Sequence, residues 1–393
     1  MKMNNEWFDV QLHKLKAQGL YRNPTVLNAY RSKYGMISST EKLNLSSNNY
    51  LGLIHDERLI NAAVQAAKTY GVGSSGSRLT TGTSDLHIEL ENIIAKFHQT
   101  EAALLFSSGY LANVGVLSAL PQKGDVILSD EWNHASLIDG CRLSKADVKV
   151  YKHSDMIELE KRLSEAQSVY NRCFIVTDGV FSMDGDVALL NEINDLAASY
   201  EAYVIVDDAH GTGVLGEYGR GTTEHFKIDV DVKIGTLSKA VGTEGGYVAG
   251  SAQLIDYLRN YARPFIFQTA LSPMVVAAAI ESFAILKQAN EKRKHLAKMS
   301  RLLREKLKEE NFNVTDGFTP IIPVIIGDND HTLQLAEKLN ERGIFAKAIR
   351  PPTVPIGTSR IRLCLTSDYT DRDIDYISKV FAEVRTELNI PTT

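Results

Sequence analysis

A lysine stands among hydroxyl groups and glycines in the segment Gly235-Thr236-Leu237-Ser238-Lys239. The amine of lysine forms Schiff bases with carbonyl compounds, and neighbouring hydroxyls and backbone N–H groups can hold a phosphate. A lysine in a loop is ordinarily only a solvated charge. Lys239 therefore indicates catalysis only if other parts of the chain supply partners for it.

An acid and a histidine come about thirty residues earlier, where an expected strand at residues 203–206 ends in Asp207-Asp208-Ala209-His210. A carboxylate and an imidazole could form half of a metal site. The acid could instead pair with the protonated ring nitrogen of pyridoxal phosphate, which requires such a partner. Alone, these residues could equally be a polar strand end, but combined with Lys239 they favour pyridoxal phosphate.

Three further segments offer groups that this cofactor needs. An expected strand at residues 102–106 runs into Ser107-Ser108-Gly109-Tyr110, where a helical pattern begins, and a helix N-terminus attracts phosphate. His134, in the loop of residues 130–136, could lie over the cofactor ring, although a single histidine is more often structural. Ser182, within residues 178–185, could bond the phenolic oxygen, and a turn-forming serine explains it equally well.

Two stretches, residues 71–76 and 211–216, match the dinucleotide-binding pattern G-x-G-x-x-G. That pattern binds a nucleotide only between a strand and a helix. The first stretch follows a helical pattern at residues 57–70, and the second continues into Glu217-Tyr218-Gly219-Arg220-Gly221, which opens no helix. A nicotinamide-dependent oxidoreductase is therefore the less favoured alternative.

Short apolar runs alternate with helical patterns through the centre of the chain, which is typical of an α/β fold with a mainly parallel sheet. The expected strands are residues 102–106, 125–128, 148–151, 174–177, 203–206, 232–235 and 247–249. Several of them end in the polar clusters described above. Because open α/β sheets bind ligands beyond the carboxyl ends of their strands, we expect the site there.

The pattern changes near residue 290. A charged helix at 291–310, a strand at 321–326, a helix near 332–342 and a strand at 361–365 indicate a smaller α+β domain. A helix is expected at about residues 7–16, with Gly19 as its stop signal. We therefore expect an N-terminal segment at 1–45, a large domain at 46–290 and a small C-terminal domain at 291–393.

Composition excludes several classes of protein. Of 393 residues, 44% are hydrophobic and 23% charged, as in ordinary globular proteins, and a net charge of −5 from scattered residues gives no basic surface for nucleic acid. The segment Met1 to Trp7 has no signal-peptide pattern and no run of eighteen apolar residues occurs, so we expect a cytoplasmic protein. Cys141, Cys173 and Cys364 lie far apart, which favours small buried side chains over a disulfide or zinc site.

Taken in order, these motifs resemble the α-oxoamine synthases, a family of fold type I pyridoxal phosphate enzymes. The resemblance spans almost the whole chain. It rests on Ser47-Asn48-Asn49-Tyr50-Leu51-Gly52, Gly73-Ser74-Ser75-Gly76-Ser77-Arg78, Ser108-Gly109-Tyr110, Asn133-His134-Ala135-Ser136, Asp178-Gly179-Val180-Phe181-Ser182-Met183-Asp184-Gly185, Asp207-Asp208-Ala209-His210 and Thr236-Leu237-Ser238-Lys239.

The resemblance implies a role for each residue. Lys239 would carry the cofactor and act as base, Asp207 would keep the pyridine nitrogen protonated, and His134 would stack on the ring and touch the substrate. His210 and Ser182 would bond the phenolic oxygen. The phosphate would be held by Gly109, Tyr110 and Thr236. The family generally shares its active site across a homodimer, with Thr269 as a candidate to reach the partner's phosphate.

Two elements point to one branch of the family, which condenses L-alanine with a pimeloyl thioester in biotin synthesis. They are Leu20-Tyr21-Arg22 and Arg350-Pro351-Pro352-Thr353-Val354-Pro355. Arg22 and Thr353 would meet the pimeloyl part, and Arg362 would grip the amino acid carboxylate through two parallel hydrogen bonds, unless it is an outward-facing strand charge. Open alternatives are the branch that uses glycine with acetyl-CoA and a non-catalytic relative. The acyl carrier is either coenzyme A or a carrier protein.

Overall fold

The computed structural model describes residues 5–37 and 39–390, which form two compact units. Unit 1 comprises residues 1–48, 183–185 and 296–393, and unit 2 comprises residues 49–182 and 186–295. The expected division into segments 1–45, 46–290 and 291–393 stays a prediction, and the compact units differ from it by grouping the N-terminal segment with the C-terminal part. Residues 391–393 lie outside the described residues. So do residues 1–4, which are part of the segment that has no signal-peptide pattern.

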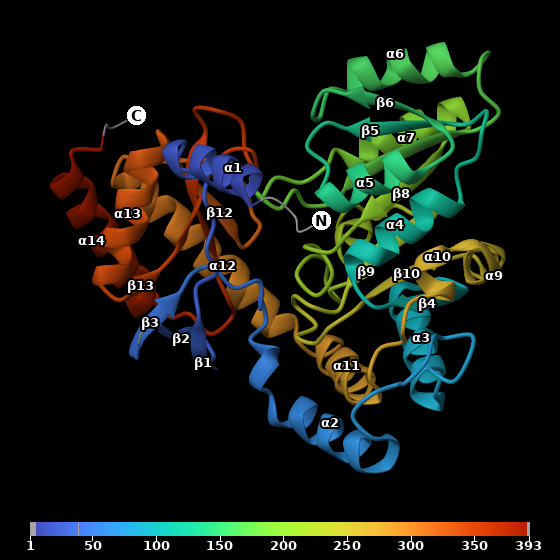
Figure 1. Ribbon diagram of the computed structural model, residues 1–393, viewed down its shortest axis with the longest axis horizontal. Coiled ribbons are helices and arrows are strands. Elements are labelled where there is room, and N and C mark those ends of the chain that lie inside the picture. The colour runs from blue at the N-terminus through green and yellow to red at the C-terminus, as the bar shows by residue number, and fades with distance from the viewer. Residues whose placement is uncertain (1–4, 38, 391–393) are drawn as a thin grey trace. The chain divides into compact units, whose positions relative to one another are not determined.

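Unit 2 contains a seven-stranded sheet with the strand order β4-β10-β9-β8-β7-β5-β6 (Figure 1). Strand β10 is antiparallel to both of its neighbours, and the other neighbouring pairs are parallel. The strands are β4 (Ala102–Phe106), β5 (Val126–Asp130), β6 (Asp147–Tyr151), β7 (Cys173–Asp178), β8 (Tyr203–Asp207), β9 (Val232–Thr236) and β10 (Gly246–Gly250). The expectation of a mainly parallel seven-stranded α/β sheet is confirmed.

Helices surround this sheet and connect its strands. They are η1 (Leu53–His55), α2 (Glu57–Tyr70), α3 (Asp85–His98), α4 (Gly109–Ala119), α5 (Ala135–Leu143), α6 (Met156–Ala166), α7 (Leu190–Tyr200), α8 (Thr222–Phe226), α9 (Ala252–Tyr261), α10 (Arg263–Ile266) and α11 (Pro273–Leu286). Helix α2 begins at Asp56, whose carboxylate accepts the N–H of Arg58, and ends at Gly71, which has a φ of 84°. The first G-x-G-x-x-G stretch thus starts where a helix ends, in the wrong context for a dinucleotide.

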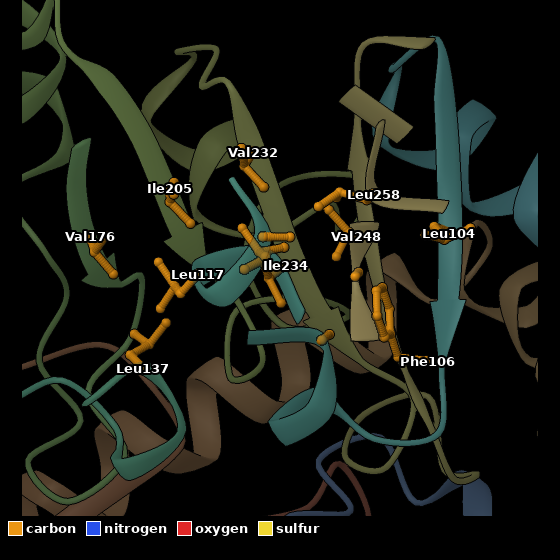
Figure 2. Packing of buried hydrophobic residues seen from close by; sticks show 14 of the residues in the cluster. Leu104, Phe106, Leu117, Leu137, Val176, Ile205, Val232, Ile234, Val248 and Leu258 are labelled. Atoms are coloured by element: carbon orange, nitrogen blue, oxygen red, sulfur yellow. The ribbon is translucent and has the colours of Figure 1, made fainter. Parts of the chain in front are cut away.

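The sheet separates two hydrophobic cores, because successive strand residues point to opposite faces. One core joins strand residues such as Val176, Ile205 and Ile234 to Leu117 of α4 and Leu137 of α5 (Figure 2). The other joins Val204 and Val206 to helices α6 and α7. The unit is therefore a three-layer sandwich. Because both faces of the sheet are covered by apolar side chains, polar groups gather at the strand ends.

One strand boundary differs in a way that matters for the site. The sequence predicts a strand at residues 125–128, whereas β5 runs to Asp130 because Ser129 and Asp130 pair with Val150 and Tyr151 of β6. Asp130 is therefore fixed at a strand end instead of lying in a loop. Tertiary pairing extends the strand over residues with low strand propensity.

Unit 1 has two four-stranded sheets, ordered β1-β2-β3-β13 and β11-β12-β15-β14. Its strands are β1 (Leu27–Arg31), β2 (Tyr34–Ile37), β3 (Thr40–Asn44), β11 (Asn313–Val314), β12 (Ile321–Gly327), β13 (Ile344–Phe345), β14 (Lys347–Ile349) and β15 (Ser359–Cys364). Its helices are α1 (Glu6–Ala17), α13 (Asn329–Glu341), α14 (Asp371–Leu388) and most of α12 (Asn290–Glu309). The expected helices and strands are present within a few residues, which confirms the α+β character of this part.

Two features of unit 1 were not predicted. The first sheet joins β3 to β13 in parallel, with Leu43 opposite Ile344 and Asn44 opposite Phe345, across about 300 residues of chain. Such short, distant strands carry almost no local signal. The second is α14, which begins with a capping box between Thr370 and Asp373.

Within the described residues, no helix is both long enough and apolar enough to span a membrane. Cys141 and Cys364 are buried and Cys173 is partly buried, and all three are free thiols, as the sequence predicts.

Candidate active site

The carboxyl ends of five parallel strands of unit 2 meet at one edge of the sheet. These strands end at Phe106, Asp130, Asp178, Asp207 and Thr236. Four of the five end residues are polar and buried, where unpaired polar groups would destabilise the fold. This edge carries most of the site residues that the sequence predicts.

Asp207 is almost fully buried at the end of β8, and both of its carboxylate oxygens accept hydrogen bonds. Oδ1 accepts the backbone N–H of Ala209 at 2.9 Å, and Oδ2 accepts Nδ2 of Asn113 at 2.6 Å. His210, also buried, lies after the same strand, and its Nδ1 is 2.7 Å from the hydroxyl of Tyr50. These contacts orient the acid and the imidazole.

Asn113 connects Asp207 to His134. The second hydrogen of its Nδ2 goes to Oγ of Ser136 at 2.8 Å, and this Oγ lies 2.7 Å from Nδ1 of His134. Nδ1 also accepts the backbone N–H of Ser136 at 3.3 Å, so the Ser136 hydroxyl donates to it and the ring proton is on Nε2. The orientation of the His134 ring thus depends on a chain of bonds that begins at Asp207.

The backbone of His134 is fixed as well. Its N–H donates to Oδ2 of Asp178 at 2.6 Å, and Asn133 donates to the carbonyl of Val176 at 2.8 Å. The His134 side chain remains exposed. Partial desolvation by the surrounding protein lowers the pKa of His134, and the charge of Lys239 acts in the same direction against that of Asp207. The ring is therefore neutral near pH 7, and a neutral imidazole can stack on a cofactor ring.

Asp178 and Asp207 are register partners on neighbouring parallel strands. Burial, together with the nearby Asp207 carboxylate, raises the pKa of Asp178 well above its usual value. Two buried carboxylates side by side do not both ionise readily. Ionising Asp178 is therefore costly beside the Asp207 carboxylate.

A second group of residues forms an anion cradle at the start of α4. Ser108 caps this helix, and its Oγ accepts the N–H of Leu111 at 3.1 Å, so the preceding N–H groups face outward at the positive end of the helix dipole. Cβ of Thr236 lies 3.2 Å from the point where a side chain on Gly109 would begin. A side chain on Gly246 would collide with the backbone of Ser108 and Gly109. Glycine at these two positions therefore lets the start of α4 pack closely against Thr236 and β10.

Lys239 is partly buried in the loop between β9 and β10. That loop is closed by bonds from Leu237 N–H to the Gly245 carbonyl at 3.0 Å and from Thr243 N–H to the Leu237 carbonyl at 2.8 Å. The positive charge of Lys239 contributes to the pKa of both His134 and Asp178. The lysine is therefore electrostatically part of the same cluster.

Ser182 is partly buried in the turn of residues 180–187, which we call the Ser182 turn. A bridge between Val180 and Val187 and a bond from Phe181 N–H to the Asp186 carbonyl at 3.0 Å close it. Tyr110 is exposed, with its ring centroid 6.4 Å from that of His134. Thr269 is exposed, and its carbonyl accepts Oγ of Ser107 at 2.9 Å, which sets this segment beside the cradle of its own chain.

Unit 1 holds the residues predicted to bind substrate. Arg362 in β15 is only 8% exposed, so the alternative of an outward-facing strand charge is wrong. Both of its terminal nitrogens lie 3.2 Å from Oδ1 of Asn48. A buried guanidinium fits an anionic partner better than a surface role.

Arg22 and Thr353, each expected to meet the pimeloyl group, lie together in unit 1 although they are 331 positions apart. Nη2 of Arg22 donates to Oγ1 of Thr353 at 3.2 Å. Both line a cavity of about 520 Å³ in unit 1, a volume in the range of small-molecule sites. Its lining combines the cations Arg22, Lys347 and Arg350 with apolar side chains such as Leu20 and Phe345.

The residues of unit 2 fit pyridoxal phosphate. They supply an amine for the aldehyde, a buried carboxylate for the ring nitrogen, a neutral imidazole and an anion cradle at a helix N-terminus. Among the described residues, no group of three or more histidine, cysteine or acidic side chains is arranged to hold a metal ion. The second G-x-G-x-x-G stretch opens no long helix, since α8 is only five residues and begins at Thr222.

Comparison with known proteins shows which family the chain belongs to. A family model for aminotransferases of class I and II matches residues 40–381. The 8-amino-7-oxononanoate synthase 2 of Bacillus subtilis is 55% identical over 99% of this chain and 100% of its own length. The 8-amino-7-oxononanoate synthase of Thermoanaerobacter pseudethanolicus is 49% identical over 97% of each chain.

The chain is an α-oxoamine synthase of the aminotransferase class I and II family. A solved structure of SPT, serine palmitoyltransferase, with an internal aldimine of pyridoxal phosphate has the same fold. It has a TM-score of 0.94 and 32% sequence identity, and the match covers 98% of each chain. The family and the fold type I architecture expected from the motifs are thereby confirmed.

Several residues of this α-oxoamine synthase site were not assigned a role from the sequence. They are Tyr50, Asn113, Ser136 and Asp178. Asn113 offered a signal, since it is a lone amide in the apolar helix α4, and a buried amide needs partners. For Asp178 and Tyr50 the only signal in the sequence was their position within motifs, because the residues that they contact are distant in sequence.

Proposed function

We propose that this protein is an 8-amino-7-oxononanoate synthase that uses pyridoxal 5'-phosphate. It condenses L-alanine with a pimeloyl thioester and releases carbon dioxide and the free thiol of the acyl carrier. One observation carries the proposal. Asp207 is buried, accepts a hydrogen bond at each carboxylate oxygen, and stands next to the Lys239 loop and the α4 cradle. The full-length similarity to named 8-amino-7-oxononanoate synthases supports the choice of substrates.

Bound pyridoxal phosphate supplies an electron sink that acidifies the α-carbon of the amino acid and later accepts electrons when carbon dioxide leaves. The protein would hold this group at its phosphate and at its ring nitrogen. Backbone N–H groups of Gly109 and Tyr110 bind the phosphate together with the Thr236 hydroxyl. Asp207 holds a proton at the ring nitrogen, and Asn113 keeps that carboxylate in position.

Lys239 and the residues around the ring perform the proton transfers. Nζ of Lys239 would hold the cofactor at its aldehyde carbon, and in its neutral form it would take the α-proton of alanine. His134 covers the ring and contacts the substrate, with its orientation set through Ser136. His210 and Ser182 donate to the phenolic oxygen, and Tyr50 orients His210.

Substrate recognition falls to unit 1. Arg362 binds the alanine carboxylate, because a guanidinium pairs with a carboxylate through two bonds. Arg22 and Thr353 bind the pimeloyl chain in the cavity that they line. The cationic lining suits a dicarboxylic acyl group better than acetyl, which has neither length nor charge.

We also propose a homodimer in the cytoplasm, where acyl thioesters of coenzyme A are available. Thr269 is the residue assigned to the partner's phosphate. Sedimentation of the purified protein tests the dimer. A Thr269→Ala variant tests the contact, since it weakens cofactor binding without changing the molecular mass of the assembly.

The experiment that tests the function begins with the visible spectrum. Wild-type protein supplied with pyridoxal phosphate gains a yellow absorption band that borohydride removes. Lys239→Ala lacks the band and loses activity, while Lys294→Ala, an exposed lysine of α12, keeps both. A colourless wild type would overturn the cofactor assignment.

Substrate assays then test the branch. Alanine and glycine are each supplied with pimeloyl-CoA, a pimeloyl carrier protein or acetyl-CoA, and carbon dioxide release is measured. We expect turnover with alanine and a pimeloyl thioester. A yellow enzyme that uses glycine with acetyl-CoA and ignores alanine is instead a 2-amino-3-ketobutyrate CoA ligase.

A further inference from the structure

His153, which the proposed chemistry does not use, lies between two carboxylates in unit 2. Its Nδ1 is 3.0 Å from Oδ1 of Asp130, and its Nε2 is 2.7 Å from Oδ2 of Asp186. Trp132 stacks on the imidazole with ring centroids 3.9 Å apart and planes 8° apart, and Phe181 meets it edge-on at 4.4 Å. The ring thus packs against two aromatic side chains and is bonded at both nitrogens.

Both ring nitrogens face carboxylate oxygens, which accept hydrogen bonds when ionised. A neutral imidazole has only one N–H and can serve only one of them, so the two contacts together require the imidazolium form. Burial by itself would lower the pKa of His153, but the hydrogen bonds and charges of Asp130 and Asp186 outweigh it and raise the pKa to about 9.

The other groups around His153 do not oppose this charge. Oε1 of Glu131 accepts the backbone N–H of His153 at 3.0 Å, and Oγ of Ser154 lies 3.3 Å from Nε2. Asp130 is 3% exposed and Asp186 is 34% exposed at the side chain, so water screens the second contact more than the first. The charged groups in contact with His153 are therefore all acidic.

One of the two carboxylates stands at the strand end from which the loop carrying His134 begins. Asp130 ends β5 and accepts the backbone N–H groups of Trp132 at 2.9 Å and Ser154 at 3.1 Å. Two residues after Trp132, the N–H of His134 is bonded to Asp178. The path of residues 130–134 is thus pinned at Asp130 on one side and at His134 on the other.

The other carboxylate belongs to the Ser182 turn. The carbonyl of Asp186 accepts the N–H of Phe181 at 3.0 Å and so closes the turn immediately before Ser182. Because Phe181 also packs against the His153 ring, that ring contacts both sides of the closure. His153 therefore joins two segments of unit 2 that are separated in sequence and that each present one cofactor-facing residue.

We propose that His153 is a positioning residue: its charged ring ties the 130–134 loop to the Ser182 turn and so keeps His134 and Ser182 in register for pyridoxal phosphate. The inference rests on the proposed function, since it concerns the same site. It assigns His153 no contact with cofactor or substrate. Its effect is felt through cofactor affinity and through the pH at which that affinity declines.

Two variants and a direct titration test this role. His153→Gln removes the charge and keeps hydrogen-bonding capacity, while His153→Phe keeps the stack on Trp132 and removes both bonds. We expect the dissociation constant of pyridoxal phosphate, measured by absorbance titration at pH 7.5, to rise about tenfold in each variant, in keeping with the loss of a charged hydrogen bond. His331→Gln, a surface histidine of α13, should change nothing.

The pH dependence distinguishes positioning from a general loss of folding. In wild type, cofactor affinity should weaken as pH rises through about 9, where the His153 imidazolium loses one proton and becomes neutral. His153→Gln should lack that part of the decline and retain the decline caused by other groups. The ring signals of His153, identified in the proton NMR spectrum by their absence from the variant, should titrate at the same pH.

The outcomes separate the two proposals. If wild type binds no pyridoxal phosphate, the proposed function fails. If wild type binds it and both His153 variants match wild type in affinity and in pH profile, or if NMR finds the His153 ring neutral at pH 7, then only the positioning role is overturned. A folding defect in one variant leaves the other variant and the wild-type titration to decide.

Discussion

Asn113 donates a hydrogen bond of 2.6 Å from its side-chain amide to Oδ2 of Asp207. The amide stands in the apolar helix α4, and the acid ends strand β8. Because the same amide nitrogen also donates to Ser136, it couples the acid that faces the cofactor ring nitrogen to the orientation of His134.

Replacing Asn113 by leucine should weaken cofactor binding. The substitution removes a bond to a charged group, which corresponds to about ten- to hundredfold in affinity. The dissociation constant of pyridoxal phosphate measured by absorbance titration checks this. Asn260→Ala on the surface of α9 is the control. An Asn113→Leu enzyme with wild-type affinity would show that Asp207 needs no support from this amide.

Replacing Arg362 by lysine should raise KM for alanine by about ten- to hundredfold and leave the visible band unchanged, because lysine cannot form two parallel bonds with a carboxylate. Steady-state kinetics with alanine as the varied substrate measures the effect. The exposed Arg301 of α12 provides the matched control as Arg301→Lys. An unchanged KM for alanine would remove Arg362 from the site.

Replacing Arg22 by glutamine should raise KM for the pimeloyl thioester and hardly affect KM for alanine. A double-mutant cycle with Thr353→Val should show coupling, since the two side chains are bonded at 3.2 Å. A heptanoyl thioester, which lacks the terminal carboxylate, is the informative second substrate. If Arg22→Gln discriminates between the two thioesters as strongly as wild type, the residue does not bind the carboxylate.

Acid should destabilise unit 2 through His98, which is buried with its Nε2 2.8 Å from the hydroxyl of Tyr247. Burial, aided by the charges of Lys233 and Arg220, lowers the pKa of His98 to about 3. The unfolded chain binds a proton at His98 below about pH 6.5 and the folded chain does not, so stability is lost as pH falls from 6.5 towards 3.

Each such histidine contributes a slope of at most about 1.4 kcal/mol per pH unit to the free energy of unfolding. His87, whose pKa burial lowers to about 4, adds to the same trend. Urea unfolding of wild type and His98→Gln at pH 7.5 and 5 measures the difference. Identical pH slopes in the two proteins would contradict the assignment.

Much of the fold follows from local patterns. Each of the seven strands of unit 2 was expected within about two residues, because most of them are short apolar runs set between helical patterns. The sheet of β1, β2, β3 and β13 was not expected. Its strands are short and its parallel pair is formed by residues about 300 positions apart, so no local pattern encodes it.

The chemistry of Lys239, Asp207, His210 and the Gly109 turn could be inferred from the sequence alone. Amines, acids and glycines at strand ends have few other uses in that order. The environment of these residues could not be inferred. Three properties depend on neighbours that are distant along the chain: the burial of Arg362, the oxygen of Asp207 that Asn113 bonds, and the raised pKa of Asp178.

The sequence by itself therefore determined which groups this protein could offer to a ligand and the strand ends near which they stand. Only the tertiary structure decided the hydrogen bonds, burial and charge state of those groups, and it alone revealed His153 between Asp130 and Asp186. The physical reason is that the two kinds of property depend on different sets of neighbours. Strand and helix patterns arise from neighbouring residues, whereas hydrogen bonding and pKa respond to every group within a few ångströms in space.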